Sequence, residues 1–158
     1  MRRLDRSGAA GIELAMLGPI LLLMTMGIVD FGAALLSRAQ IARALAGSAE
    51  YATLAGQNSV APATIVSNAR TLAAAVNSYF LDSPTVTAVV NQGAAAGAKC
   101  CPGTSWSCST STSFSCADGS TPGVYLTVTA QYPFRPLFPG DAYLSGKTFT
   151  DSIVAPLQ

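Results

Sequence analysis

The feature that most constrains this chain is an uncharged apolar run close to its amino terminus. Residues 14–29 are sixteen consecutive positions without an ionisable side chain. As a helix this run is about 24 Å long at 1.5 Å per residue, against a hydrocarbon core of roughly 30 Å. Apolar residues resume after Asp30 and continue to Leu36. We therefore expect a membrane-spanning helix over residues 14–36.

Arginines near the amino terminus give this span an orientation. Arg2, Arg3 and Arg6 precede it, whereas the next basic residue is Arg38. Cytoplasmic flanks of membrane helices are enriched in Lys and Arg. We expect the amino terminus in the cytoplasm and the residues after about Leu36 outside it.

An alanine-rich amphipathic segment continues the helix beyond the span. Over residues 37–55 the charged side chains fall opposite an apolar face, as in a helix that covers a core. The apolar residues that recur at helical spacing are Ile41, Leu45, Ala49 and Ala52. We expect one helix over residues 9–56, about 70 Å long at the standard rise.

The start of this helix resembles a known processing signal. A basic leader ends at Gly8, and AAGIE follows, so that Glu13 is the fifth residue after that glycine. This arrangement resembles the prepilin peptidase signal of type IV pilin-like proteins. The wider stretch, residues 8–32, includes Pro19 and a glycine-bounded Asp30. It is similar to the TadE/TadF-like minor pseudopilins of the tight-adherence (Flp, type IVc) pilus system.

The resemblance implies a processed membrane protein. Cleavage would fall between Gly8 and Ala9, making residues 1–8 a cleaved leader and Ala9 the new amino terminus. The location implied is the bacterial cytoplasmic (inner) membrane, with passage to the pilus or cell surface as an extension. The implied partners are the prepilin peptidase, other pilins and pseudopilins, the pilus assembly platform and membrane lipid.

Glu13 is a carboxylate at the mouth of an apolar helix, which is costly unless the group is solvated or paired. The freed amino group of Ala9 on a neighbouring subunit would be a suitable partner. A glutamate lying in the headgroup layer is the alternative interpretation. We expect the pairing, which would make Glu13 an assembly residue.

Asp30 and Pro19 are the other unusual residues of the span. Asp30 is expected at the far membrane interface, where hydration is the simpler interpretation and pairing with a partner helix is the other. Pro19 lacks the N–H that would bond to residue 15, so we expect a helix kink there.

Residues 57–158 are expected to form an extracytoplasmic domain that opens with a second helix. Pro62 marks its first turn, Asn58 or Ser59 is the expected cap, and the helix ends before Ser83. The residues expected to face the core are Ile65, Ala69, Leu72, Val76 and Tyr79.

Three later segments have the alternation or the β-branched content of strands, namely residues 85–90, 124–132 and 147–154. A proline-rich stretch, residues 132–140, is expected as a stiff extended connector with Phe134, Leu137 and Phe138 partly buried. The order of elements favours an α+β fold in which a small antiparallel sheet of about three strands is backed by helix.

A loop rich in Ser, Thr and Gly between the first two strands holds the four cysteines, Cys100, Cys101, Cys108 and Cys116. Outside the cytoplasm, disulfides are the natural interpretation. A bridge between Cys100 and Cys101 is strained. Two pairings stay open: Cys100–Cys108 with Cys101–Cys116, or Cys100–Cys116 with Cys101–Cys108. Trp106 and Phe114 are expected to anchor this loop to the sheet, and an exposed contact patch is the alternative interpretation.

Composition argues against several function classes. The chain has no histidine, which removes Ser-His-Asp and Cys-His catalysis and makes a zinc site a poor interpretation. Its formal charge is +1, and residues 9–158 hold six basic and seven acidic side chains, so no strong field attracts nucleic acid. We expect no enzyme activity, no cofactor, no metal and no small-molecule substrate.

The sequence therefore predicts a structural assembly protein, a pilin-like minor subunit for Flp/Tad pilus biogenesis, adherence and secretion. The alternative is a signal-anchored extracytoplasmic binding domain that is neither processed nor assembled.

Overall fold

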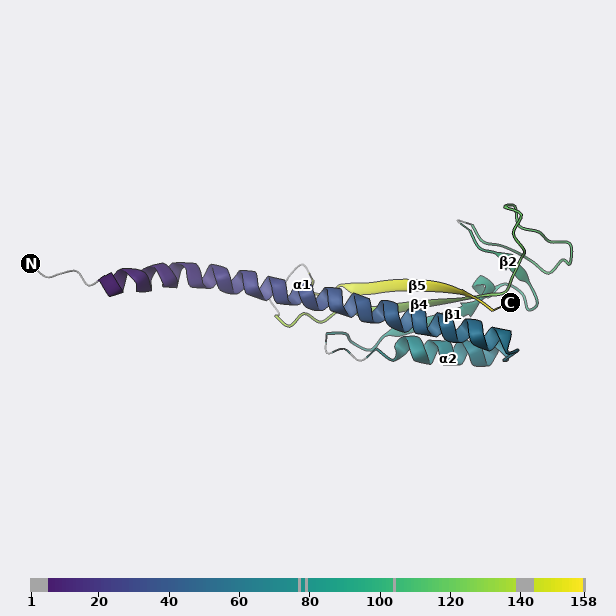
Figure 1. Cartoon of the computed structure of the whole chain (residues 1–158), viewed down its shortest axis with the longest axis horizontal. Coiled ribbons are helices and arrows are strands. Elements are labelled where there is room, and N and C mark those ends of the chain that lie inside the picture. Colours follow the sequence, from purple (N-terminus) through teal and green to yellow (C-terminus); the bar gives the residue numbers. More distant parts are fainter. Residues whose placement is uncertain (1–5, 77, 79, 104, 139–143, 158) are drawn as a thin grey trace, which may run out of the picture.

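The structure, a computed structural model, describes residues 6–76, 78, 80–103, 105–138 and 144–157. Two helices are followed by two small sheets, which confirms the expected α+β class. The elements are α1 (Arg6–Gln57), α2 (Pro62–Ala74), β1 (Thr85–Val90), the short 3-10 helix η1 (Asn91–Gly93), β2 (Lys99–Cys101), β3 (Ser107–Ser109), β4 (Tyr125–Pro133) and β5 (Thr148–Pro156). We call the described part of the chain from Pro62 onward the sheet domain. In Figure 1 the first half of α1 projects away from the sheet domain and the second half lies along it.

α1 is a single helix of 52 residues that includes Pro19. One stripe along its second half is buried against the sheet domain. The buried residues recur mostly three or four positions apart, as expected for an amphipathic helix: Asp30, Ala33, Ala34, Ser37, Ile41, Leu45, Ser48, Ala52 and Ala55. The stripe begins at Asp30, so contact with the sheet domain starts inside the segment that the sequence assigned to the membrane.

α2 has Pro62 at its first position, but its N-cap is Ala61, without a side-chain hydrogen bond. The expected capping role of Asn58 or Ser59 is wrong because both residues lie in the turn that follows α1, ahead of the actual N-cap. The Asn58 side chain donates to the Leu54 carbonyl, and Ser59 has a positive φ of 56° in the turn.

The buried face of α2 differs from the expected one by one position. Ile65, Ala69 and Ala73 are buried at a spacing of four, whereas Leu72 is 43% exposed. The helix ends at Ala74, earlier than expected, which leaves Val76 half-buried beyond it. Tyr79 lies outside the described residues.

The main sheet has the strand order β1-β4-β5, and both pairs are antiparallel. The three expected strands are confirmed to within two residues. Alternate β4 residues are buried, namely Leu126, Val128, Ala130 and Tyr132. Both helices pack on this sheet, α1 mainly along β5 and α2 mainly along β1. The helices and the buried side of the sheet therefore form one core.

Tyr132 fixes the end of α2 to the sheet. It is fully buried, and its hydroxyl donates to the Ala73 carbonyl. Burial raises the pKa of Tyr132 above its ordinary value of 10.0, because the charged phenolate is poorly solvated there.

This shift predicts how stability falls at alkaline pH. The folded protein holds the Tyr132 proton more tightly than the unfolded chain, so its contribution is complete below about pH 10 and is lost as the pH rises above that. Tyr132→Phe should cost about 1–3 kcal/mol at neutral pH through the unpaired carbonyl, and its stability should fall less steeply above pH 10. Thermal unfolding from pH 7 to 11 measures both; parallel pH profiles for the two proteins would contradict the prediction.

Candidate functional site

The first half of α1 is an exposed apolar rod. Apart from Met26, which is half-buried, its large apolar side chains from Ile12 to Val29 are 47–74% exposed and lie on all sides of the helix. Among the described residues, α1 from Gly11 is long and apolar enough to cross a membrane, with a mean hydropathy of 2.1 in its most apolar window and none of that window buried. This is the character of a membrane anchor.

Glu13 lies near the start of this rod. Its side chain is exposed between Ile12 and Leu14, which are 66% and 70% exposed. Gly8 and Ala9 belong to the first turns of α1, upstream of Glu13. Leader cleavage at Gly8 and the pairing of Glu13 stay predictions, as does the kink at Pro19.

Asp30 lies at the end of the rod. The simpler expectation was a hydrated side chain at the membrane interface, and the structure differs from it. The side chain is fully buried rather than hydrated. One carboxylate oxygen accepts the Leu137 N–H at 2.8 Å, and the other accepts the Phe138 N–H at 3.2 Å. A partner helix was the other expectation, but these donors come from the same chain, 107 and 108 residues away. Asp30 thus ties the connector after β4 to α1.

The connector is more tightly held than expected, and we call residues 134–138 the base loop. Phe134 is buried with Ala33 and Ala34 of α1. Phe138 is half-buried, whereas Leu137 is 45% exposed, so the expectation that Leu137 is partly buried is wrong. Its N–H is bonded to Asp30, and its side chain is exposed at the point where the apolar rod meets the sheet domain.

The four cysteines form two disulfides, Cys100–Cys108 and Cys101–Cys116. This is the first of the two pairings that the sequence left open. Cys100 and Cys101 are adjacent in β2, so their side chains point to opposite faces. Cys100 lies directly across from Cys108 of β3, while Cys101 reaches the loop beyond it. The sequence did not predict the two-stranded sheet itself, because strands of three residues leave little alternation to read.

Asn91 is an anchor for this disulfide loop that sequence reasoning missed. It is 4% exposed and has a φ of 48°. Its amide donates to the Ala98 carbonyl at 2.6 Å and accepts the Tyr125 N–H at 2.8 Å. The only sequence signal for this role is the turn-forming Asn-Gln-Gly that directly follows the strand ending at Val90. Asn91 therefore joins the end of β1, the loop and β4.

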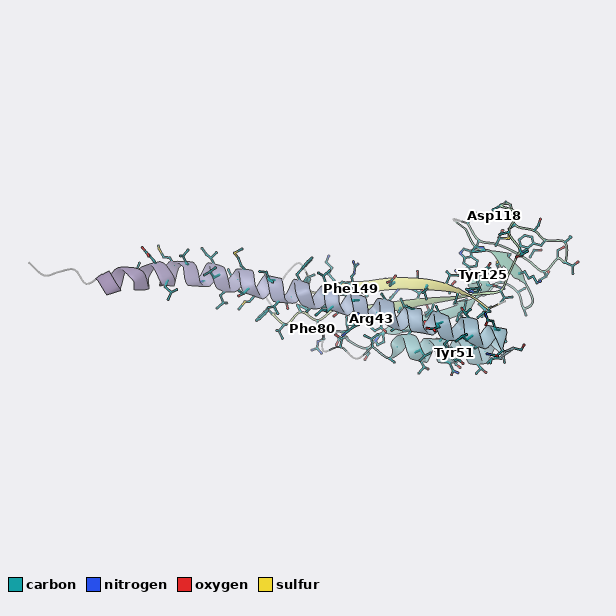
Figure 2. The ribbon with its side chains drawn as sticks, viewed as in Figure 1. Arg43, Tyr51, Phe80, Asp118, Tyr125 and Phe149 are labelled. Atoms are coloured by element: carbon teal, nitrogen blue, oxygen red, sulfur yellow. A yellow bond between two sulfur atoms is a disulfide. The ribbon has the colours of Figure 1, made fainter. Side chains whose placement is uncertain are left out.

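Trp106 confirms its expected role as an anchor. Its ring meets that of Tyr125 edge to face, with the centroids 5.7 Å apart. Figure 2 shows Tyr125 and Asp118 at the end of the molecule far from the exposed rod. Hydrogen bonds from Ser120 lower the pKa of Asp118. The disulfide loop thus forms the distal end of the sheet domain.

The described part of the chain contains no candidate metal site. There, no group of three or more His, Cys, Asp or Glu side chains is placed to hold a metal ion. A hollow of about 550 Å³ lies between the α1–α2 turn and residues 94–98, and its lining carries no charged side chain. It offers apolar surface rather than reactive groups.

A comparison with known proteins identifies the segment that carries this arrangement. The family model described as TadE-like protein matches residues 8–50. No curated protein and no solved structure matches the chain. The matched segment contains Glu13 and Asp30, and it ends within the stripe of α1 that packs on the sheet domain. TadE-like proteins are structural, pilus-related proteins. Along its long amino-terminal helix this chain is therefore similar to the TadE-like proteins of the Tad pilus system, as its opening motif predicted.

Proposed function

We propose that this protein is a pilin-like minor subunit of a Tad pilus. The leader is removed after Gly8, the rod of α1 sits in the cytoplasmic membrane, and the sheet domain lies outside the cytoplasm. Glu13 pairs with the freed amino group of Ala9 on a neighbouring subunit, which sets the register between subunit helices. The partners are the prepilin peptidase, other pilins and the assembly platform.

One observation carries this proposal: among the described residues, the buried stripe of α1 begins at Asp30. The rod with Glu13 at its start is largely exposed in the described part of the structure, so lipid or neighbouring helices can surround it. A helix that serves only as a membrane anchor does not need the Glu13 carboxylate, because an unpaired charge within an apolar span is costly. A subunit that packs against its neighbours through this helix can use the carboxylate as a pairing group.

The first experiment determines the amino-terminal sequence of the protein from its host, with and without the prepilin peptidase. We expect Ala9 as the first residue in the wild type, and the intact leader when the peptidase is absent. Replacing Gly8 should also block trimming. A mature chain that begins at Met1, or after the rod, would favour the unprocessed binding domain instead.

Glu13→Ala separates trimming from assembly. Trimming should continue, while the assembled fraction should fall sharply, since removing one partner of a buried charge pair costs about 3–5 kcal/mol. Leu14→Ala is the matched control, because it shortens a neighbouring exposed side chain without touching a charge. Pilus fractions and immunoblots measure both variants; a Glu13→Ala protein that assembles like Leu14→Ala would rule out the pairing.

A further inference from the structure

We infer that the sheet domain is partly submerged in the outer headgroup layer of the membrane, with the base loop and the α1 turns from Phe31 to Leu36 in contact with lipid. This rests on the proposed function in one respect, namely that the rod of α1 spans a membrane. It adds a second lipid contact, made by a loop more than 100 residues away from the rod in sequence.

The apolar surface of α1 does not stop where the sheet domain begins. Past Asp30 the inner side of the helix is buried, but Phe31, Leu35 and Leu36 on its outer side are 58%, 55% and 67% exposed. Leu137 of the base loop, 45% exposed, adds to this surface. From Asp30 to Leu36 the helix rises about 9 Å. That is close to the roughly 5–10 Å over which interfacial segments are immersed.

The backbone of the base loop suits such a layer. Phe134 and Arg135 donate their N–H groups to the carbonyls of Lys147 and Phe80, at 2.8 and 2.7 Å. Leu137 and Phe138 donate theirs to Asp30. Residue 136 is a proline and has no N–H. Every backbone donor of the loop is thus bonded, which irregular backbone requires where water is scarce.

Charged side chains lie next to this apolar surface, on the side away from the rod. Arg38 follows Leu36 by two residues and packs over the Phe149 ring at 5.2 Å. Arg135 pairs with Asp82 at 3.2 Å, and both side chains are more than half exposed. Figure 2 places Phe80 and Phe149 at the end of the sheet domain that faces the rod. Long basic side chains at a membrane interface reach lipid phosphates while their aliphatic stems lie on apolar surface.

The apolar surface of the base is continuous with the rod, which favours lipid as the molecule that covers it. Exposed apolar side chains surround the rod up to Val29, and the surface from Phe31 to Leu36 continues one side of it without an interruption. A protein partner would cover one face, whereas this surface joins a segment that is apolar on all faces. Asp30 lies where the two meet, with both carboxylate oxygens already bonded inside the protein.

Tryptophan quenching in vesicles tests the inference. The full chain carries a single tryptophan, so Trp106→Phe gives a silent background. Leu137→Trp and, separately, Leu36→Trp report the base, Met16→Trp reports the rod, and Val154→Trp on β5 is the matched exposed control. The vesicles contain phosphatidylethanolamine and phosphatidylglycerol, with or without bromine on the upper acyl chain. Both base reporters should be quenched to about half the extent of Met16→Trp, because interfacial groups lie at shallower depth.

The outcomes separate the inference from the proposed function. Quenching of Met16→Trp with Leu137→Trp behaving like Val154→Trp would leave the span intact and overturn the submerged base, whatever Leu36→Trp shows. No quenching of Met16→Trp would remove the span, and the inference with it. Quenching of Val154→Trp equal to that of Leu137→Trp would also overturn it, because β5 would then touch lipid without any distinction of the base.

Discussion

Replacing Asp30 with alanine is expected to release the base loop from α1 and to lower the free energy of unfolding by about 2–5 kcal/mol. The substitution removes two hydrogen bonds to a carboxylate and leaves the Leu137 and Phe138 N–H groups without an acceptor. Hydrogen exchange should speed up across residues 134–138, and thermal unfolding in detergent should shift to lower temperature. The rod should remain helical, because among the described residues its large apolar side chains, Met26 aside, are exposed and not packed in the core.

Two variants give this experiment its controls. Asp30→Asn keeps the shape and one acceptor oxygen but turns an NH2 group toward the second donor, so its loss should be intermediate. Ser37 lies on the same stripe of α1, and its buried hydroxyl has no hydrogen-bond partner in the described part of the chain. Ser37→Ala should leave stability unchanged or raise it by up to about 1 kcal/mol. Equal losses for Asp30→Ala and Ser37→Ala would contradict the role assigned to Asp30.

Removing the Cys101–Cys116 disulfide is expected to unfold the distal loop while the main sheet stays folded. This bridge closes a loop of 15 residues, which corresponds to about 3 kcal/mol in the chain-entropy account. β2 and β3 have three residues each, too few to hold the loop by burial alone. In the Cys101→Ala/Cys116→Ala protein, Cys100–Cys108 still joins β2 to β3. Amides of residues 109–119 should therefore exchange rapidly, while those of β2, β3, β4 and β5 stay protected.

Ser113→Ala is the matched control for the disulfide variant, since it changes an exposed side chain of the same loop. It should leave exchange in residues 109–119 as in the wild type. Two results would count against the prediction: residues 109–119 that exchange as in the wild type without the bridge, or β4 and β5 that lose protection together with them. Peptide-resolved hydrogen exchange distinguishes these results.

Local periodicity made most of the elements predictable. The stripe with Ile41, Leu45 and Ala52 and the alternation along β4 follow from the spacing of apolar residues, and both are confirmed. The errors occur where neighbours decide between similar positions. Leu72 and Ala73 fit the same amphipathic pattern, but the close approach of α2 to the sheet buries the smaller residue and leaves Leu72 exposed.

The sequence predicted the role of some residues of the site but not of others. Glu13 and the rod are recognisable because a charge in an apolar helix is visible in the sequence, and the family match covers this segment. The partners of Asp30 were not predictable, because backbone donors carry no sequence signal. Nor was the role of Asn91, whose two bonds join segments separated by 7 and 34 residues.

The sequence by itself determined the long helix, its apolar rod with Glu13, the second helix, the three main strands and the likeness to TadE-like proteins, since all of these depend on patterns within a short stretch of chain. Only the tertiary structure decided how Asp30 is satisfied, which cysteines pair and where the sheet domain first meets α1. Those outcomes depend on groups brought together from distant positions, as when a carboxylate of α1 accepts backbone donors 107 residues along the chain.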